Sequence, residues 1–137
     1  EVEHVNVEPL RLLGNNGFIP VIAPLGVGLG GETYNINADL VAGEVAAALG
    51  AEKLIHLTDV QGILGDDGHL ITTLSRKEAE RLMEESVIDG GMLPKVESSV
   101  RALRGGTAKA HIIDGRVPHA ILLELFTREG VGTEIVL

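Results

Sequence analysis

Short apolar runs alternate with helix-forming stretches along nearly the whole chain, and this alternation restricts the fold more than any other sequence feature. The runs have the length and the Val, Ile and Leu content of buried strands. Strands are expected at 18–23, 53–58, 71–74, 110–113 and 132–137. Helices are expected at about 9–15, 37–49, 75–85, 92–103 and 118–126. This order predicts a three-layer αβα sandwich with a mainly parallel central sheet.

Helix-start and helix-stop residues mark several of these boundaries. Asn37 is suited to cap the helix that follows it, and Gly50 to close that helix. Ser75 and Glu78 have the spacing of a capping box at the start of the next helix. The segment 24–32 contains four glycines and is expected to be a loop or a loose hairpin.

Composition narrows the class of protein. Hydrophobic residues make up 45% of the 137 residues and aromatic residues only 2%, so aliphatic side chains must fill the core of a single domain, 1–137. The net charge of −9 argues against a nucleic acid partner. Phosphate groups would have to be bound by backbone N–H groups, helix N-termini and a few lysines. The absence of cysteine excludes a thiol nucleophile. No apolar run could span a membrane, and a cytoplasmic location fits.

The first candidate site segment runs from 26 to 39. Asn35, Asn37 and Asp39 place two amides and a carboxylate within five residues at a helix start. The two amides share strand parity and can point the same way, which suits a ligand with carboxylate and amide groups. An equally good interpretation is a plain helix cap at Asn37, with Asp39 favoured by the helix dipole.

Two further segments could contact a nucleotide. The segment 57–64 follows a strand and joins hydroxyl, carboxylate and glycine groups, although a tight turn at Gly62 would explain it as well. In 89–96, two glycines precede a helix whose first turns contain Lys95. A helix N-terminus favours anions, and Lys95 could then reach a transferring phosphoryl group as a point charge. Taken alone, a glycine entry with a solvated lysine is the simpler interpretation.

The histidines have no metal-ligand spacing, so no protein metal site is predicted. His56 lies within an apolar strand and is expected to be a hydrogen-bonded core residue.

Together these segments resemble the amino acid kinase family. The matching stretches are 34–39, 57–64, 90–96 and 111–119, followed by 130–133. They cover essentially the whole chain in order. The resemblance implies transfer of the γ-phosphoryl group of ATP, with Mg²⁺, to a carboxylate, carbamate or phosphate. The best-matching members act on the side-chain carboxylate of N-acetyl-L-glutamate in arginine biosynthesis.

The resemblance also implies roles for individual residues. Lys95 would stabilise charge on the transferring phosphoryl group, and Asp39 would hold catalytic lysines in place. Asn35 would bind the acetylated amino acid, with Asn37 lining the same site. The implied ATP contacts are Thr58, Asp59, Val60, Gln61, Gly62, Ile63, Val87, Ile88, Asp89, Gly91 and Met92. An ionised acceptor carboxylate needs no general base, so positioned charges suffice for the chemistry.

The family pattern also includes an N-terminal half, with a glycine-rich phosphate loop and a second catalytic lysine, that is not found in 1–137. The chain is therefore expected to be the nucleotide-binding half of a homo-oligomeric enzyme, inactive by itself. In arginine-inhibited relatives the residues matching His111, Glu124 and Gly130 lie near the inhibitor, although Glu124 is equally well explained as an exposed helix residue. Alternative hypotheses are a kinase of the glutamate 5-kinase or uridylate kinase type, a non-catalytic arginine-sensing domain, or a plain binding module.

Overall fold

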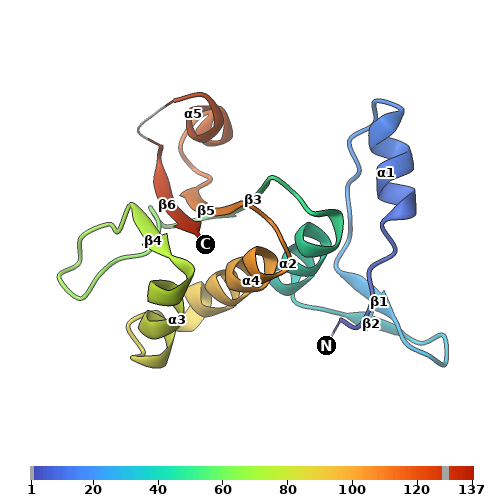
Figure 1. The fold of residues 1–137 in the computed structure, drawn as a ribbon, viewed down its shortest axis with the longest axis horizontal. Helices are drawn as coiled ribbons and strands as arrows, with labels where there is room; N and C mark the ends of the chain where they lie inside the picture. The colour runs from blue at the N-terminus through green and yellow to red at the C-terminus, as the bar shows by residue number, and fades with distance from the viewer. Residues whose placement is uncertain (1, 128–129) are drawn as a thin grey trace.

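The chain folds into a four-stranded sheet with helices on both faces and an N-terminal extension beside it (Figure 1). This computed structural model describes residues 2–127 and 130–137. The elements are α1 (Glu8–Asn15), β1 (Leu25–Val27), β2 (Thr33–Asn35), α2 (Ala38–Leu49), β3 (Lys53–Thr58), β4 (Thr73–Ser75), α3 (Arg76–Glu84), the 3₁₀ turn η1 (Gly90–Met92), α4 (Leu93–Arg104), β5 (Lys109–Asp114), α5 (Ala120–Phe126) and β6 (Gly132–Val136).

The strand order of the main sheet is β3-β5-β6-β4. The pairs β3–β5 and β4–β6 are parallel and β5–β6 is antiparallel. Helices α2, α3 and α4 pack on one face, and α5 lies beyond the other face (Figure 1). This arrangement confirms the predicted three-layer fold with a mainly parallel sheet.

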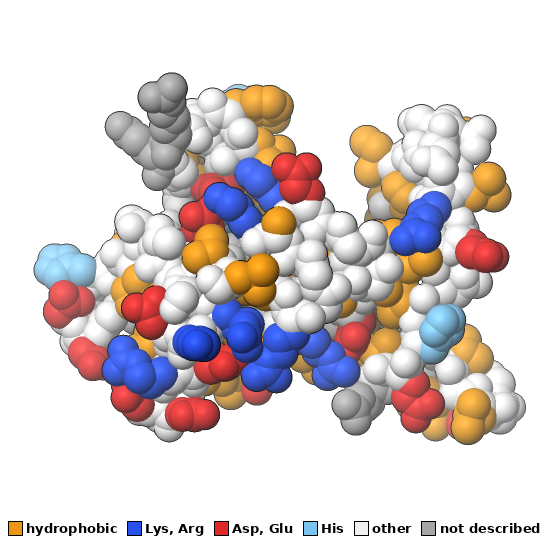
Figure 2. Space-filling view, viewed as in Figure 1, with side chains coloured by type: hydrophobic (Ala, Val, Ile, Leu, Met, Phe, Trp, Pro, Cys, Tyr) orange, Lys and Arg blue, Asp and Glu red, His pale blue; other side chains and the backbone are white. Residues whose placement is uncertain are grey.

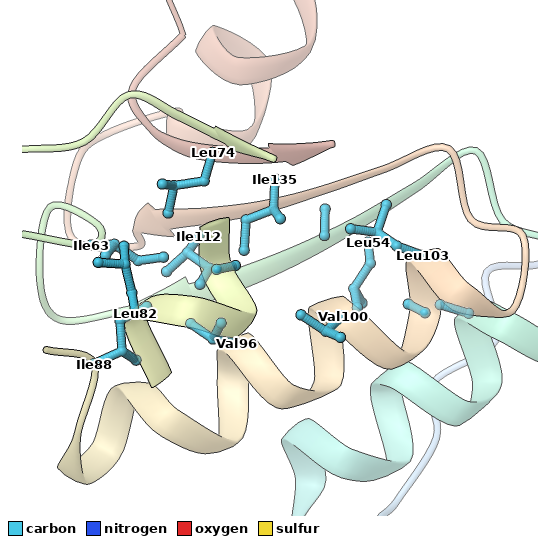
Figure 3. Close-up of a cluster of buried hydrophobic side chains, with 14 residues drawn as sticks. Leu54, Ile63, Leu74, Leu82, Ile88, Val96, Val100, Leu103, Ile112 and Ile135 are labelled. Carbon is cyan, nitrogen blue, oxygen red and sulfur yellow. The ribbon is translucent and has the colours of Figure 1, made fainter. Parts of the chain in front are cut away.

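The core lies between α4 and the sheet. Val96, Val100 and Leu103 of α4 point toward the strands, where they meet Leu54 and Ile112 (Figure 3). Ile112, Ile135 and Val96 are completely buried. In a strand, successive side chains alternate between faces. Ala110 and Ile112 of β5 therefore face α4, while His111 and Ile113 face the opposite layer.

Two helices are fixed against each other by a close backbone approach. A Cβ on Gly43 of α2 would lie 2.6 Å from the Oγ of Ser98 and 2.7 Å from its carbonyl oxygen, so only glycine allows α4 to come this near. The predicted ends of α2 are confirmed: Asn37 caps it with its side-chain oxygen, and Gly50 ends it in the left-handed conformation. The capping box of Ser75 and Glu78 is also present.

The N-terminal arm, residues 2–36, extends away from α2 (Figure 1). The predicted hairpin around 24–32 is confirmed by the β1–β2 pairing. The predicted strand at 18–23 is wrong, because no strand of the described residues pairs with it. Its side chains are largely in solvent, with Ile19 90% and Val21 95% exposed. Figure 2 shows apolar side chains on the surface of this arm.

Several boundaries differ from the prediction by a few residues. The strand predicted from 71 begins at Thr73, because Ile71 instead donates its N–H to the carbonyl of Ile63 and closes the preceding loop. The helix predicted from 118 begins at Ala120. Within the ranges described, no helix has the length and hydropathy needed to cross a membrane.

Candidate active site

An ion pair joins the first turns of α2 and α4. The Nζ of Lys95 lies 2.8 Å from Oδ2 of Asp39, and the side chains are 18% and 23% exposed, respectively. The Oγ of Ser98 donates a hydrogen bond to the main-chain carbonyl of Asp39, and the Oγ of Ser99 donates to that of Lys95. The packing of the two helices therefore sets the position of both charges.

His56 adds a third polar group to this pair. It lies in β3 with 5% of its side chain exposed, and its Nδ1 is 3.3 Å from Oδ1 of Asp39. Burial lowers the pKa of His56, the Asp39 carboxylate opposes that change, and the charge of Lys95 adds to it. The sequence predicts a hydrogen-bonded core residue, and the burial of His56 confirms its place in the core. Its apolar neighbours in β3 give no sign of the contact with the start of α2.

The cluster lies at the carboxyl-terminal edge of β3 and β5. Helix α2 runs back into β3 and α4 runs back into β5, so their first turns lie where these strands end. At that edge the N–H of Gly115 donates to the carbonyl of Thr58 at 2.8 Å. Open α/β sheets bind their ligands at such an edge.

A second ion pair lies at the end of β5 and was not predicted from the sequence. Arg116 donates to the carboxylate of Asp114 at 2.9 and 2.8 Å. These hydrogen bonds, together with one from the N–H of Arg116 to Oδ1 at 2.9 Å, lower the pKa of Asp114 from 3.8 to about 2. The Asp114 carboxylate raises the pKa of Arg116, and the Asp59 carboxylate of the loop after β3 adds a smaller effect of the same sign.

The loop after β3 divides into an accessible part and a packed part. Asp59, Val60 and Gln61 are exposed, and Thr58 is half-buried.

Gly62 and Ile63, the next residues of this loop, turn inward. A Cβ on Gly62 would lie 2.6 Å from the Oγ1 of Thr133, and the Ile63 side chain is 1% exposed in the core. The N–H of Ile63 donates to Thr133 and its carbonyl accepts from Ile71. The side chain and both main-chain polar groups of Ile63 are therefore engaged within the fold.

The segment before α4 shows a similar division. Ile88 is 3% exposed and belongs to the core, and Val87 packs against that core. Asp89 and Gly91 are exposed, and Met92 is half-buried. The η1 turn leads from these residues into α4, whose third residue is Lys95. Of the segment 87–92, the part nearest α4 is thus the part open to a ligand.

The two asparagines before α2 have different surroundings. Asn37 accepts hydrogen bonds from the N–H groups of Asp39 at 2.9 Å and Leu40 at 3.2 Å, as expected for a helix cap. Asn35 is exposed at the end of β2. The cap holds Asp39 in the first turn of α2, two residues after Asn37.

A separate pocket of about 400 Å³ lies on the α5 side of the sheet. It brings together the three residues predicted for an inhibitor site, His111, Glu124 and Gly130. The Nδ1 of His111 is 2.7 Å from Oε1 of Glu124, and the N–H of Val131 donates to Oε2 at 2.9 Å. Burial lowers the pKa of His111, while Glu124 opposes this effect. The glutamate side chain is 9% exposed, so it is not an ordinary surface residue.

Comparison with known proteins gives a consistent picture. The sequence profile described as "Amino acid kinase family" matches residues 1–114. The acetylglutamate kinases of Syntrophus aciditrophicus and Aquifex aeolicus are each 58% identical to this chain over 137 residues, which is 100% of the chain and 46% of each relative. The chain therefore spans about half the length of these curated relatives.

Solved structures agree with the sequence matches. The N-acetylglutamate synthase of Neisseria gonorrhoeae, complexed with coenzyme A and L-arginine, superposes with a TM-score of 0.90 and 38% identity, over 98% of this chain and 31% of the synthase chain. The carbamate kinase of Giardia lamblia bound to AMP-PNP shares the fold, with a TM-score of 0.71 and 19% identity over 98% of this chain and 45% of that chain. This chain belongs to the amino acid kinase family.

Proposed function

We propose that this chain supplies the ATP site and part of the substrate site of an acetylglutamate kinase, which phosphorylates the side-chain carboxylate of N-acetyl-L-glutamate in arginine biosynthesis. The observation that carries the proposal is the Lys95–Asp39 ion pair at the carboxyl-terminal edge of β3 and β5, with a distance of 2.8 Å. The identity of 58% to relatives named acetylglutamate kinase supports the choice of reaction. A cytoplasmic, homo-oligomeric enzyme is part of this proposal.

In this function Lys95 neutralises charge on the phosphoryl group during transfer. Phosphoryl transfer depends on positioning and on fixed positive charge more than on proton transfer. Asp39 keeps the ammonium group in place, and the hydroxyls of Ser98 and Ser99 fix the backbone that carries both residues. The acceptor carboxylate is ionised at neutral pH, so no general base is required.

The nucleotide would be held by the accessible parts of two segments. These are Thr58, Asp59, Val60 and Gln61 after β3, and Asp89, Gly91 and Met92 before α4. Gly62, Ile63, Val87 and Ile88 would support these contacts from within the fold. Over the described part of the chain no group of three or more His, Asp or Glu side chains could hold a metal ion. We therefore expect Mg²⁺ to be bound mainly by the phosphates and water.

The acceptor would approach from the β2 side. Asn35 is exposed there, and Asn37 lies between it and Asp39 in the sequence. An amide can donate to a carboxylate and accept from an N–H, which suits an N-acetylated amino acid. In this proposal Asn35 binds the acetylated amino acid directly, and Asn37 acts chiefly by fixing the start of α2.

A second candidate function is arginine binding in the pocket formed by His111, Glu124 and Gly130. Glu124 and Glu134 line the pocket together with Lys53 and Lys109. Glu134 is paired with Lys109 at 2.6 Å, so Glu124 is the carboxylate that would receive a guanidinium group. The similar synthase structure from Neisseria gonorrhoeae was determined as a complex with L-arginine. Arginine would then be a regulator of the kinase, or the main ligand if the domain is only a sensor.

The first experiment is calorimetric titration of the chain with Mg-ATP. Lys95→Ala should weaken binding about tenfold or more, because a charge-assisted contact contributes roughly 1.5–3 kcal/mol. Lys77→Ala, in the first turn of α3, is the matched control and should bind normally. ATP binding that is equal in the two variants would contradict the assignment of Lys95.

The reaction itself is tested in a chimera, in which this chain replaces the matching segment of the Aquifex aeolicus acetylglutamate kinase. The chimera should form acyl phosphate from N-acetyl-L-glutamate, and the isolated chain should not.

Titration of the chain with arginine, beside a Glu124→Gln variant, tests the pocket formed by His111, Glu124 and Gly130. If the chain binds arginine through Glu124 and never binds ATP, the sensor function is favoured over catalysis.

A further inference from the structure

His56 is a buried polar residue whose place the kinase chemistry does not by itself explain. It is 5% exposed in the middle of β3. Its neighbour on the same face of β3 is Leu54, and its register partner on β5 is Ile112, both core residues. Among the described residues its Nε2 has no hydrogen-bond partner, and its Nδ1 faces Asp39 at 3.3 Å.

The two oxygens of Asp39 are divided between two partners. Oδ2 lies 2.8 Å from Lys95, and Oδ1 faces the imidazole of His56. An ionised carboxylate can only accept hydrogen bonds. A neutral imidazole therefore has to carry its proton on Nδ1, since an unprotonated Nδ1 would place its lone pair against the carboxylate oxygen. Nε2 is then the buried, unprotonated nitrogen.

We propose that His56 is a positioning residue for phosphoryl transfer: its Nδ1–H holds the Asp39 carboxylate in the orientation that presents Oδ2 to Lys95. Contact with only one oxygen would let the carboxylate rotate and carry the ammonium group with it. With both oxygens engaged, from β3 and from α4, the carboxylate is fixed between the sheet and the helix layer. The catalytic consequence rests on the function proposed above, whereas the contact itself does not.

The protonation of His56 makes this arrangement sensitive to acid. The charged groups that face it are Asp39 from α2 and Lys95 from α4, while β5 presents the apolar Ile112. Burial and Lys95 lower its pKa, so the imidazole is neutral at neutral pH. Protonation would place a second cation on Asp39, in competition with Lys95. The ion pair should therefore weaken as pH falls below the ordinary histidine range.

The contact can be measured in the isolated chain by long-range ¹H–¹⁵N NMR of the imidazole rings, with His56 assigned from a His56→Asn variant. We expect His56 to be the tautomer that carries its proton on Nδ1. The exposed His4, His69 and His119 are expected to be mixtures of the Nδ1–H and Nε2–H tautomers. Asp39→Asn should shift His56 toward the Nε2–H form. The proposal is overturned if His56 carries its proton on Nε2 in the unaltered chain. It is also overturned if Asp39→Asn leaves the ¹⁵N chemical shifts of the His56 ring unchanged.

The consequence for catalysis is measured in the chimera with two variants. His56→Asn keeps an amide donor near the place of Nδ1, whereas His56→Leu offers only apolar contacts that suit the surrounding core. We expect His56→Leu to lower kcat roughly tenfold to a hundredfold with little change in KM for ATP, because misplaced catalytic groups slow the chemical step. His56→Asn should restore most of kcat and lack the acid limb of the pH profile. The pKa of that limb in the unaltered chimera should match the value from NMR.

These outcomes separate positioning from packing. If His56→Leu lowers the melting temperature but leaves kcat and its pH profile unchanged, His56 only fills the core and the proposal fails. If the chimera with an intact His56 is inactive, the proposed reaction is contradicted, and the NMR result alone decides whether His56 orients Asp39.

Discussion

At the scale of single residues, the site consists of charged groups that are held by a second set of side chains. Lys95 is held by Asp39, whose carboxylate also contacts His56. On the other face of the sheet, Glu124 accepts a hydrogen bond from the N–H of Val131 and lies 2.7 Å from Nδ1 of His111. In each case a carboxylate with two partners is fixed more firmly than one with a single partner. Arg116 alone donates to both oxygens of Asp114, and this pair gives a pH test that needs no ligand.

Arg116→Ala should raise the pKa of Asp114 from about 2 part of the way toward 3.8, because the hydrogen bonds from the guanidinium group are lost while the N–H of residue 116 still donates to Oδ1. The native pKa is lowered, so this contribution to stability is present above 3.8 and is lost as pH falls toward 2. The ¹³C carboxyl shift of Asp114, followed by NMR, measures the change. Arg81→Ala, which removes an exposed pair with Glu85, is the control and should leave Asp114 unchanged. A pKa that stays near 2 in Arg116→Ala would show that another group holds the carboxylate.

At the scale of elements, the close approach of α2 and α4 sets the geometry of the site. Asp39 and Lys95 lie in the first turns of these helices, and Gly43 meets Ser98 one turn further along α2. Any change that separates the helices should move the two charges apart. A substitution at Gly43 that separates α2 from α4 should therefore also change the distance between Asp39 and Lys95.

Gly43→Ala should destabilise the chain by about 1–3 kcal/mol, because the new methyl group has to displace Ser98 and its backbone. Urea denaturation measures this free energy of unfolding, and titration with Mg-ATP should show weaker binding in the same variant. Gly14→Ala in α1 is the control, since no atom of the described ranges lies within 4 Å of the added Cβ. Equal stability of the two variants would mean that the helices can adjust without cost.

The sequence predicted these elements well wherever the signal was local. The caps at Asn37 and Ser75, the end at Gly50 and the strand at 53–58 depend on neighbouring residues, and the structure has all of them. The segment 18–23 has the composition of a strand but no pairing partner among the residues that the structure describes, so composition alone was insufficient.

The candidate site was predictable only in part. The family resemblance predicts the roles of Lys95 and Asp39. These two residues are far apart in the sequence, and no local sequence pattern predicts that they lie together. The contact of His56 with Asp39 and the Asp114–Arg116 pair were not predicted. Contacts between β3 and the start of α2 depend on how the layers pack, and one sequence gives no measure of that.

At the scale of the whole molecule, the sheet and its helices form the stable unit, and the N-terminal arm adds little to its core. The buried cluster contains residues from 46 to 135, and none from the arm. The arm carries strongly exposed apolar side chains, including Ile19, Val21 and Leu29. Exposed apolar surface of this kind favours association with other surfaces.

Val21→Asp should change the free energy of unfolding by less than about 0.5 kcal/mol, because the side chain is already in solvent. Ile112→Asp, its counterpart in the core, should prevent folding. Circular dichroism during urea denaturation measures both effects, and light scattering should show less self-association for Val21→Asp. A large loss of stability in Val21→Asp would mean that the arm packs on the sheet in solution.

The alternation of side chains along β5 has a consequence for how such a domain can evolve. Ile112 supports the face that carries Asp39 and Lys95, whereas the adjacent His111 belongs to the pocket with Glu124. Substitutions that inactivate one face need not alter the side chains of the other. A gene lineage could therefore lose one activity by drift, keep the other under selection, and still inherit the same scaffold.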